Sequence, residues 1–234
     1  MPGLGGLVGK VVVIAGGATG IGAATACRLG RDGGLVVVGD VAADGARQTA
    51  DEIVASNGTA TAAAFDLSDS ASLAELVGTA VNGYGGVDAL FNVGADTSTL
   101  RGDSDVVDIE LELWNRVMAV SLRGYVAAMK YALPQMLSRG GGTIINMSSA
   151  AAFHGEPTRP AYATAKAGIG ALTRHVASRW GKDGIRCNTV APGFTATDAI
   201  RSAAQWPDLE ASALRRMQAL ESVPPMTSPA SSRS

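Results

Sequence analysis

Short runs of β-branched and other apolar residues recur along the chain, and each is followed by a turn-forming segment. Such runs, which carry almost no charge, are typical of strands that are covered on both faces. They predict strands at 10–14, 35–40, 59–65, 87–91, 143–147 and 185–190. Helical spacing of apolar residues predicts helices at 23–29, 112–137 and 160–180. The alternation predicts a single α/β domain with a doubly wound, mostly parallel sheet.

The first predicted strand runs into a glycine-rich turn, and a predicted helix follows. Gly16, Gly20 and Gly22 form the pattern G-x-x-x-G-x-G, with Thr19 and Ile21 between them. Glycine lets the backbone approach a diphosphate closely, and the amino end of a helix offers unpaired N–H groups and a positive dipole end. The turn therefore predicts a dinucleotide site, although glycines also occur where a helix simply joins a strand tightly.

A carboxylate stands at the end of the second predicted strand. Asp40 lies eighteen residues beyond Gly22, where it can accept hydrogen bonds from both hydroxyls of an adenosine ribose. A 2′-phosphate at that place would meet a like charge. Asp40 therefore favours NAD(H) over NADP(H), and so does the presence of Thr19 rather than a basic residue before Gly20. The alternative is that Asp40 caps the following helix.

Three polar residues lie after the fifth predicted strand and on the next predicted helix. Ser149 ends that strand segment, Tyr162 comes thirteen residues later, and Lys166 four residues after that. Residues four apart share one face of a helix, and open α/β sheets bind ligands at the carboxyl ends of their strands. We therefore expect the three side chains to converge there. The alternative is a solvated lysine beside a half-buried tyrosine.

These motifs together resemble the short-chain dehydrogenase/reductase family, whose active site is a Ser, a Tyr and a Lys at this spacing. The resemblance covers roughly residues 8 to 200 and rests on several separate motifs. It implies a Rossmann-type fold and an NAD-dependent oxidoreductase that interconverts a secondary alcohol and a ketone. Tyr162 would be the acid or base, Lys166 would also bind the nicotinamide ribose, and Ser149 would orient the substrate oxygen.

The resemblance implies further site residues. Asp66 and the adjacent Leu67 match the segment that contacts the adenine, although Asp66 could belong to a turn, and Ser68 or Asp69 could cap the next helix. Ser121 stands where the family carries a catalytic Asn. The other residues that would hold the cofactor are Asn92, Gly94, Pro192, Gly193, Thr195 and Thr197.

The chain departs from the family pattern at single positions. Ala15 replaces a Thr before the glycines, and Val93 removes an amide that usually braces the sheet. Ser121 is shorter than the usual Asn, which helps to position a water in a proton relay. These changes leave open a second function, a NAD(H)-binding protein with little or no catalysis. A sugar-nucleotide epimerase would use the same Tyr and Lys but needs a larger substrate region.

The carboxyl-terminal part departs further. Residues 221–234 are rich in Ser and Pro, where the family has a last helix and strand, so we expect a disordered tail and an exposed sheet edge. The Rossmann-type NAD-binding domain would then cover residues 1–220, with 198–220 as a mobile cover over the substrate. Loss of these elements would favour the binding protein without catalysis, and it puts one usual subunit interface of the expected dimer or tetramer in doubt.

Composition and charge exclude several classes of function. The formal net charge is −2, and the 19 Lys and Arg residues are scattered along the chain, so binding to nucleic acid or to a membrane is disfavoured. Cys27 and Cys187 do not form a cysteine framework, and the amino terminus lacks a secretory signal, so we expect a cytoplasmic protein. The expected partner is a small-molecule alcohol or ketone.

Two further features are interpreted as structural. The carboxylates within 101–112 indicate a solvated loop and helix start rather than a metal site, because no histidine accompanies them. His154 is interpreted as a surface residue. The predicted helix at 112–137 would contribute core or subunit contacts through Trp114, Val117, Met118, Leu122, Val126, Met129, Leu133 and Met136.

Overall fold

The computed structural model describes residues 6–197, 201, 202, 207 and 211. The chain divides into two compact units, residues 1–193 and 194–234, and each is described by itself. Except for four residues, the predicted cover at 198–220 and the predicted tail at 221–234 lie outside the described residues. In the part of the chain that is described, no helix combines the length and the apolar character needed to cross a membrane.

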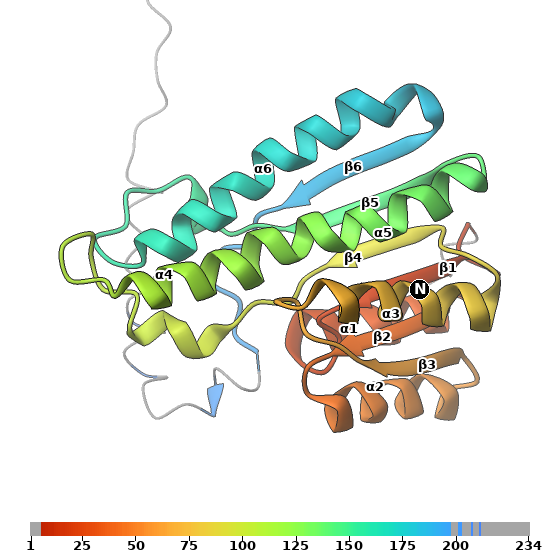
Figure 1. Cartoon of the computed structure of the whole chain (residues 1–234). Helices are drawn as coiled ribbons and strands as arrows, with labels where there is room; N and C mark the ends of the chain where they lie inside the picture. Colours follow the sequence, from red (N-terminus) through yellow and green to blue (C-terminus); the bar gives the residue numbers. More distant parts are fainter. Residues whose placement is uncertain (1–5, 198–200, 203–206, 208–210, 212–234) are drawn as a thin grey trace, which may run out of the picture. The chain divides into compact units, whose positions relative to one another are not determined.

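The first unit contains a sheet of six parallel strands in the order β3-β2-β1-β4-β5-β6. The order reverses between β1 and β4, and ligands of open α/β sheets bind at such a switch point. The predicted doubly wound sheet is confirmed, and in the described sheet β6 is an edge strand (Figure 1). The strands are β1 (Val11–Ala15), β2 (Leu35–Asp40), β3 (Thr59–Ala64), β4 (Ala89–Asn92), β5 (Gly142–Met147) and β6 (Ile185–Val190).

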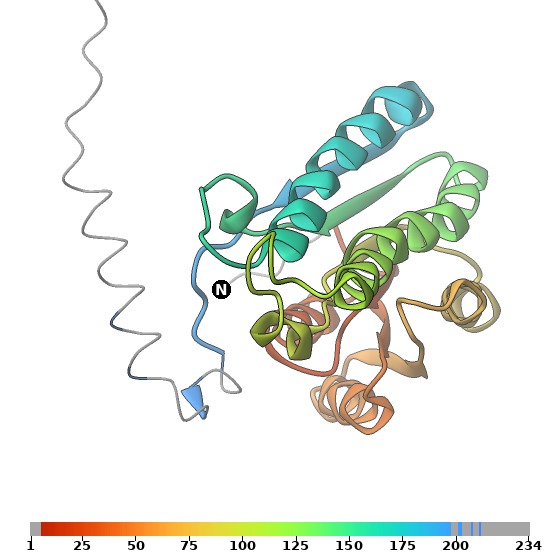
Figure 2. The ribbon, with the colours of Figure 1, turned by 60° about the vertical axis from the view of Figure 1, so that its left-hand side comes forward.

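Helices cover both faces of this sheet. Two of them pack on one face, α1 (Gly20–Arg31) and α2 (Ala43–Ala55). The other face carries α3 (Ser70–Tyr84), α5 (Gly124–Ser138) and α6 (Pro160–Trp180), and α4 (Leu111–Met118) packs against α6 (Figures 1 and 2). The helix predicted at 160–180 is confirmed. Short 3₁₀ turns complete the unit: η1 (Thr97–Arg101), η3 (Ala150–Ala152) and η4 (Gly181–Asp183).

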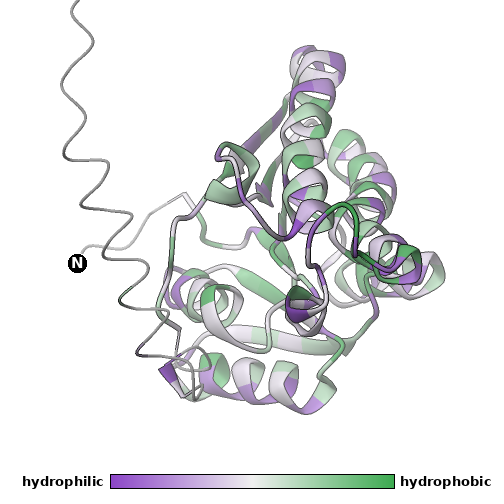
Figure 3. Cartoon of the chain, turned by 90° about the vertical axis from the view of Figure 1, so that its left-hand side faces the viewer, coloured by the Kyte–Doolittle hydropathy of each residue, from purple (hydrophilic) through white to green (hydrophobic). Residues whose placement is uncertain are grey.

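The core consists of two apolar layers, one on each side of the sheet. Alternate residues of a strand point to opposite faces, so Val13 of β1 enters the layer under α3 and α5, while its neighbour Ile14 enters the layer under α1 and α2. Both side chains are fully buried. This explains why the predicted strands are continuously apolar rather than alternating. Figure 3 shows strands that are mainly green or white beside helices that carry purple, hydrophilic residues.

The helix predicted at 112–137 is one helical stretch with a π turn inside it. The stretch consists of α4, the π turn η2 (Ala119–Arg123) and α5. A π turn holds more residues than an α turn, which changes the helical phase. Tyr125 is fully buried after it, whereas Val126, which was predicted to be a core or subunit contact, is 44% exposed. The prediction for Val126 was therefore wrong as far as the core is concerned.

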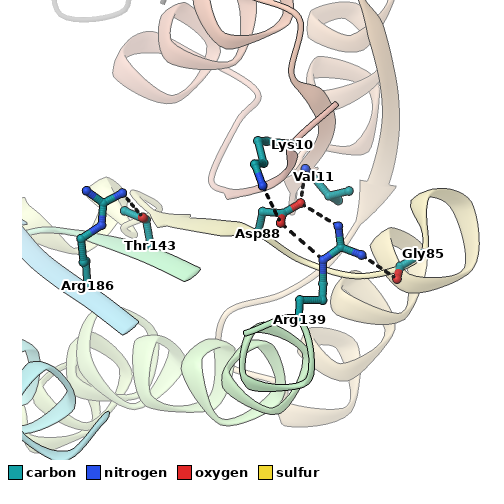
Figure 4. Close-up of polar contacts among 7 residues, drawn as sticks. All are labelled: Lys10, Val11, Gly85, Asp88, Arg139, Thr143 and Arg186. Atoms are coloured by element: carbon teal, nitrogen blue, oxygen red, sulfur yellow. Dashed lines mark hydrogen bonds and ion pairs between the residues drawn. The ribbon is translucent and has the colours of Figure 1, made fainter. Parts of the chain in front are cut away.

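An ionic cluster joins the amino ends of two strands, far from the expected site. The carboxylate of Asp88 accepts a hydrogen bond from the Val11 N–H (2.9 Å), forms an ion pair with Arg139 (3.2 Å) and lies 3.5 Å from Lys10 (Figure 4). Burial alone would raise the pKa of Asp88, but the Val11 and Arg139 hydrogen bonds and the two cations together lower it. The cluster fixes β1, β4 and the end of α5 to one another.

Candidate active site

The glycine turn between β1 and α1 is compact. The N–H groups of Gly16 and Gly17 both donate to the Gly39 carbonyl at 2.8 Å, and Gly16 has φ +113°, a conformation that favours glycine. A Cβ atom on Gly22 would collide with the Gly16 carbonyl oxygen, and one on Gly16 would collide with the backbone of Gly94. The backbone therefore packs here in a way that any side chain would prevent.

The amino end of α1 is suited to an anion. Thr19 is the N-cap residue, but its side chain makes no capping hydrogen bond. The first N–H groups of α1, such as those of Gly20 and Ile21, have no partner within the helix. A diphosphate is the kind of group that such N–H groups and the helix dipole bind. The described residues of this turn therefore fit a dinucleotide.

Asp40 lies beside this turn and is bound to the backbone on both sides of β2. One oxygen of its carboxylate accepts from the Ala18 N–H and the other from the Ala42 N–H, both at 3.0 Å. The second bond closes a turn before α2 (Ala43–Ala55), whose N-cap residue is Ala42 and has no side-chain cap, so the alternative that Asp40 caps this helix was wrong. A carboxylate oxygen has more than one acceptor site, so Asp40 can still accept from ribose hydroxyls.

The segment after β3 forms a turn. The Oδ1 atom of Asp66 accepts from the N–H of Ser68 (2.7 Å) and from its hydroxyl (2.8 Å), so the alternative of a turn residue is found. Asp69 caps α3 through the Ala71 N–H (2.9 Å). Leu67 is nearly buried, and a Cβ atom on Gly94 would lie 2.6 Å from its side chain. The structure thus brings Leu67, Gly94 and Gly16 together.

Asn92 braces the sheet. It is fully buried, and its Nδ2 atom donates to Oδ1 of Asn146 on β5 at 2.9 Å. Asn146 in turn donates to the Thr173 hydroxyl (3.0 Å), which also accepts from Thr189 of β6 (2.8 Å). From the sequence, Val93 was expected to weaken the bracing of the sheet because it replaces an amide. The amides of Asn92 and Asn146 supply this bracing instead. Oδ1 of Asn92 has no partner among the described residues.

Lys166 is buried rather than solvated, so the solvated alternative was wrong. Its side chain is 1% exposed. The Nζ atom donates to the Met147 carbonyl (2.9 Å) and to the Tyr125 hydroxyl (3.4 Å). The Ser148 hydroxyl donates to the Lys166 carbonyl at 2.7 Å, which fixes its backbone to the end of β5. Burial lowers the pKa of Lys166 to about 8.

Tyr162 and Ser149 lie at the same edge of the sheet. The Nζ atom of Lys166 is 5.8 Å from the centre of the Tyr162 ring, and this half-buried ring packs on a small cluster formed by α4 and α6. Ser149 follows β5 directly, and its Oγ atom accepts from the Ala151 N–H at 3.2 Å. Because η3 lies against α6, Ser149 is near the helix that carries Tyr162 and Lys166, and the convergence of the three side chains stays a prediction.

Asp103 holds the amino end of α6, a role that the sequence did not predict. Its carboxylate accepts from the N–H groups of Ala161 (3.1 Å) and Tyr162 (2.8 Å). Only 1% of its surface is exposed, so for Asp103 the prediction of a solvated loop was wrong. The reason is the α6 terminus, whose unpaired N–H groups require an acceptor. Nothing in the spacing distinguishes Asp103 from the exposed Asp105 and Asp108.

Replacing Asp103 by Ala should therefore destabilise the protein. Two N–H groups at a buried helix terminus would lose their acceptor, and we expect the free energy of unfolding to fall by about 1 to 3 kcal/mol. Urea unfolding followed by circular dichroism measures this. Asp108→Ala removes an exposed carboxylate from the same loop and should change little. Equal losses in the two variants would contradict the capping role.

The remaining predicted residues are placed as follows. Ser121 is buried within the π turn, a type of turn that is frequent at functional sites. The Pro192 carbonyl accepts from the Ala150 N–H (2.9 Å), which brings the segment of Pro192 and Gly193 next to Ser149. Thr195 and Thr197 belong to the second unit, so their role stays a prediction.

The chain has clear relatives. The family model described as short chain dehydrogenase matches residues 10–208. A protein of Bradyrhizobium diazoefficiens named as a probable short-chain type dehydrogenase/reductase is 38% identical over 82% of this chain and 68% of its own length. Cis-4-hydroxycyclohexanecarboxylate dehydrogenase of Sinomonas cyclohexanicum is 35% identical over 82% and 75%. The crystal structure of levodione reductase has a TM-score of 0.82 and 27% identity, covering 91% of this chain and 83% of that one.

Proposed function

This chain belongs to the short-chain dehydrogenase/reductase family, and we propose that it is an NAD(H)-dependent oxidoreductase that interconverts a secondary alcohol and a ketone. The matching family model is described as short chain dehydrogenase, and several relatives are named as dehydrogenases of alcohols. The observation that carries the proposal is the buried ammonium of Lys166, 5.8 Å from the centre of the Tyr162 ring. This ammonium lies beside the carboxyl end of β5, and the glycine turn follows β1 of the same sheet.

The cofactor would be held along the carboxyl ends of the strands. The N–H groups at Thr19, Gly20 and Ile21 would bind the diphosphate, and the tight packing of the glycine turn against Gly94 supports this fit. Bound NAD(H) would supply or take up the hydride. The other residues of the first unit proposed to hold it are Gly16, Gly22, Asp40, Asp66, Leu67, Asn92, Tyr162, Lys166, Pro192 and Gly193.

Tyr162 would act as both the acid and the base, and Lys166 and Ser149 would assist it. In reduction, the Tyr162 hydroxyl donates its proton to the substrate oxygen, and in oxidation the Tyr162 phenolate accepts the proton of the alcohol. The positive charge of Lys166 stabilises the phenolate that reduction leaves behind. Ser149 accepts one hydrogen bond from the Ala151 N–H, so its own O–H remains to donate to the substrate oxygen.

The preference for NAD(H) is testable at Asp40. We expect NADH to bind the unaltered protein at least about tenfold more tightly than NADPH, because a 2′-phosphate would meet the carboxylate. Asp40→Asn keeps one acceptor oxygen, for either the Ala18 or the Ala42 N–H, but removes the charge, so the difference should shrink to less than about threefold. Fluorescence titration of both dinucleotides measures it, with Asp44→Asn, 98% exposed in its side chain, as the control. Equal affinities in the unaltered protein would contradict the assignment.

A substrate screen tests the reaction itself. One relative is named for a hydroxycyclohexane carboxylate, one for cyclohexanol and one for a 7α-hydroxysteroid, so we propose an alcohol on an apolar ring. The screen would follow NADH absorbance with cyclic ketones and NAD⁺ reduction with the matching alcohols. Tight NADH binding without any turnover would favour the alternative of a binding protein, which Ser121 in place of the usual Asn supports.

A further inference from the structure

Tyr125 is a fully buried tyrosine in the first turn of α5, and the proposed reaction does not yet use it. Its ring belongs to the apolar layer beneath α3, α5 and α6. Its hydroxyl lies 3.4 Å from the Nζ atom of Lys166, 3.1 Å from the Gly94 carbonyl and 3.4 Å from the Met147 carbonyl. The only polar atom of this side chain is therefore directed at the proposed catalytic lysine.

The hydrogen-bond types at this hydroxyl can be assigned from chemistry. An ammonium only donates and a carbonyl only accepts, whereas a phenol can do both. Burial, and then the charge of Tyr162 when it is ionised, raise the pKa of Tyr125 above its usual range, so the hydroxyl keeps its proton. It therefore donates to a carbonyl, with Gly94 at the shorter distance, and accepts from Lys166.

These contacts fix the position of the ammonium. The described residues supply two acceptors for its three N–H groups, the Met147 carbonyl and the Tyr125 hydroxyl. The third N–H remains for a ligand. Tyr125 and Ser121 lie on the same helical stretch, and the hydroxyl of Tyr125 hydrogen-bonds Lys166. Tyr125 thereby connects the lysine to Gly94, which packs against the glycine turn.

We propose that Tyr125 is a positioning residue of this site, whose neutral hydroxyl accepts a hydrogen bond from Lys166 and holds its ammonium beside Tyr162. The inference rests on the proposed function, because the lysine is catalytic only if the protein is an oxidoreductase. The alternative is that Tyr125 simply fills the core. The two differ in what happens when the hydroxyl alone is removed.

Tyr125→Phe removes that hydroxyl and keeps the ring. The matched control is Tyr131→Phe, on the same helix, where the hydroxyl lost is an exposed one that lies 3.0 Å from Ser70. The chain has only four lysines, Lys10, Lys130, Lys166 and Lys182. Their side-chain ¹³C resonances can therefore be followed by NMR against pH, with Lys166→Met to assign the resonance of interest.

We expect Lys166 to titrate near pH 8 in the unaltered protein. In Tyr125→Phe its pKa should fall by about one unit, because a hydrogen bond that favours the charged form is lost. In Tyr131→Phe it should not change. In the active enzyme, the alkaline pH at which kcat for ketone reduction falls should also decrease, because the ammonium loses its charge at a lower pH, and kcat should be reduced about tenfold. Equal titration of Lys166 in all three proteins would overturn the proposal.

The NMR result does not require turnover, so the two proposals can fail separately. A lowered Lys166 pKa in a protein that reduces no ketone would support the role of Tyr125 and count against the oxidoreductase. An unchanged pKa in an active protein would overturn Tyr125 alone. If Tyr125→Phe does not fold, Tyr125→Met, which fills core space with a flexible apolar chain, is measured in its place. It also removes the ring whose centre lies 5.1 Å from Nζ of Lys166, so the pKa should fall by at least as much.

Discussion

Tyr162→Phe should reduce kcat at least about 100-fold, because general acid and base catalysis by a positioned side chain contributes about 10²- to 10⁴-fold. Phe keeps the ring that packs between α4 and α6 but has no proton to give or take. The affinity for NADH should stay within about twofold, since the glycine turn and Asp40 are untouched. Stopped-flow turnover and fluorescence titration on the same preparation measure the two effects.

The control for this prediction is Tyr84→Phe. Its hydroxyl lies 2.9 Å from Thr61 in an exposed position, so its loss should leave both kcat and NADH affinity unchanged. Turnover that survives in Tyr162→Phe would refute Tyr162 as the acid and base. A parallel loss of NADH binding would instead mean that the variant disturbs the cofactor site.

Gly22→Ala should weaken both the fold and the binding of NADH. The added Cβ atom would collide with the carbonyl oxygen of Gly16, and a backbone atom cannot move aside as a side chain can. Overpacking of this kind costs about 1 to 3 kcal/mol. The turn must open to relieve it, so NADH affinity should fall at least about tenfold. Urea unfolding and fluorescence titration measure the two losses.

Gly78→Ala provides a matched substitution. Gly78 lies inside α3, and a Cβ atom there would meet nothing within 4 Å. Because Ala favours a helix interior over Gly by about 1 kcal/mol, this variant should be equally or more stable and should bind NADH normally. The idea of a closed glycine turn fails if Gly22→Ala unfolds at the same urea concentration as the unaltered protein.

The fold and the catalytic edge could be predicted from local patterns. Apolar runs mark buried strands because both faces of a parallel sheet are covered, and β2 and β6 were predicted with the bounds that the structure has. Tyr162 and Lys166 were predicted to converge because helical spacing alone places them on one face. Residues whose partners are near in sequence, such as Asp66 in its turn, also followed from local rules, although only as an alternative.

Side chains with distant partners could not be predicted in this way. Asp103 binds an N–H group 58 residues away, and its neighbours Asp105 and Asp108 have the same chemistry but remain exposed. Tyr125 appears in the sequence as one apolar residue of a long helix, and a π turn decides that it, rather than Val126, is buried. Such roles depend on how elements pack, which spacing does not encode.

The amides of Asn92 and Asn146 have a further consequence for strand alignment. They are direct neighbours across β4 and β5, and Thr189 of β6 continues the same row. Sliding β5 by two residues would keep every side chain on its own face, so apolar burial alone hardly opposes it. It would, however, leave polar groups in hydrocarbon at a cost of about 1 to 3 kcal/mol each. This row therefore selects one alignment of the strands during folding. It places Met147, at the end of β5, beside the end of β4, from which the chain continues to Gly94.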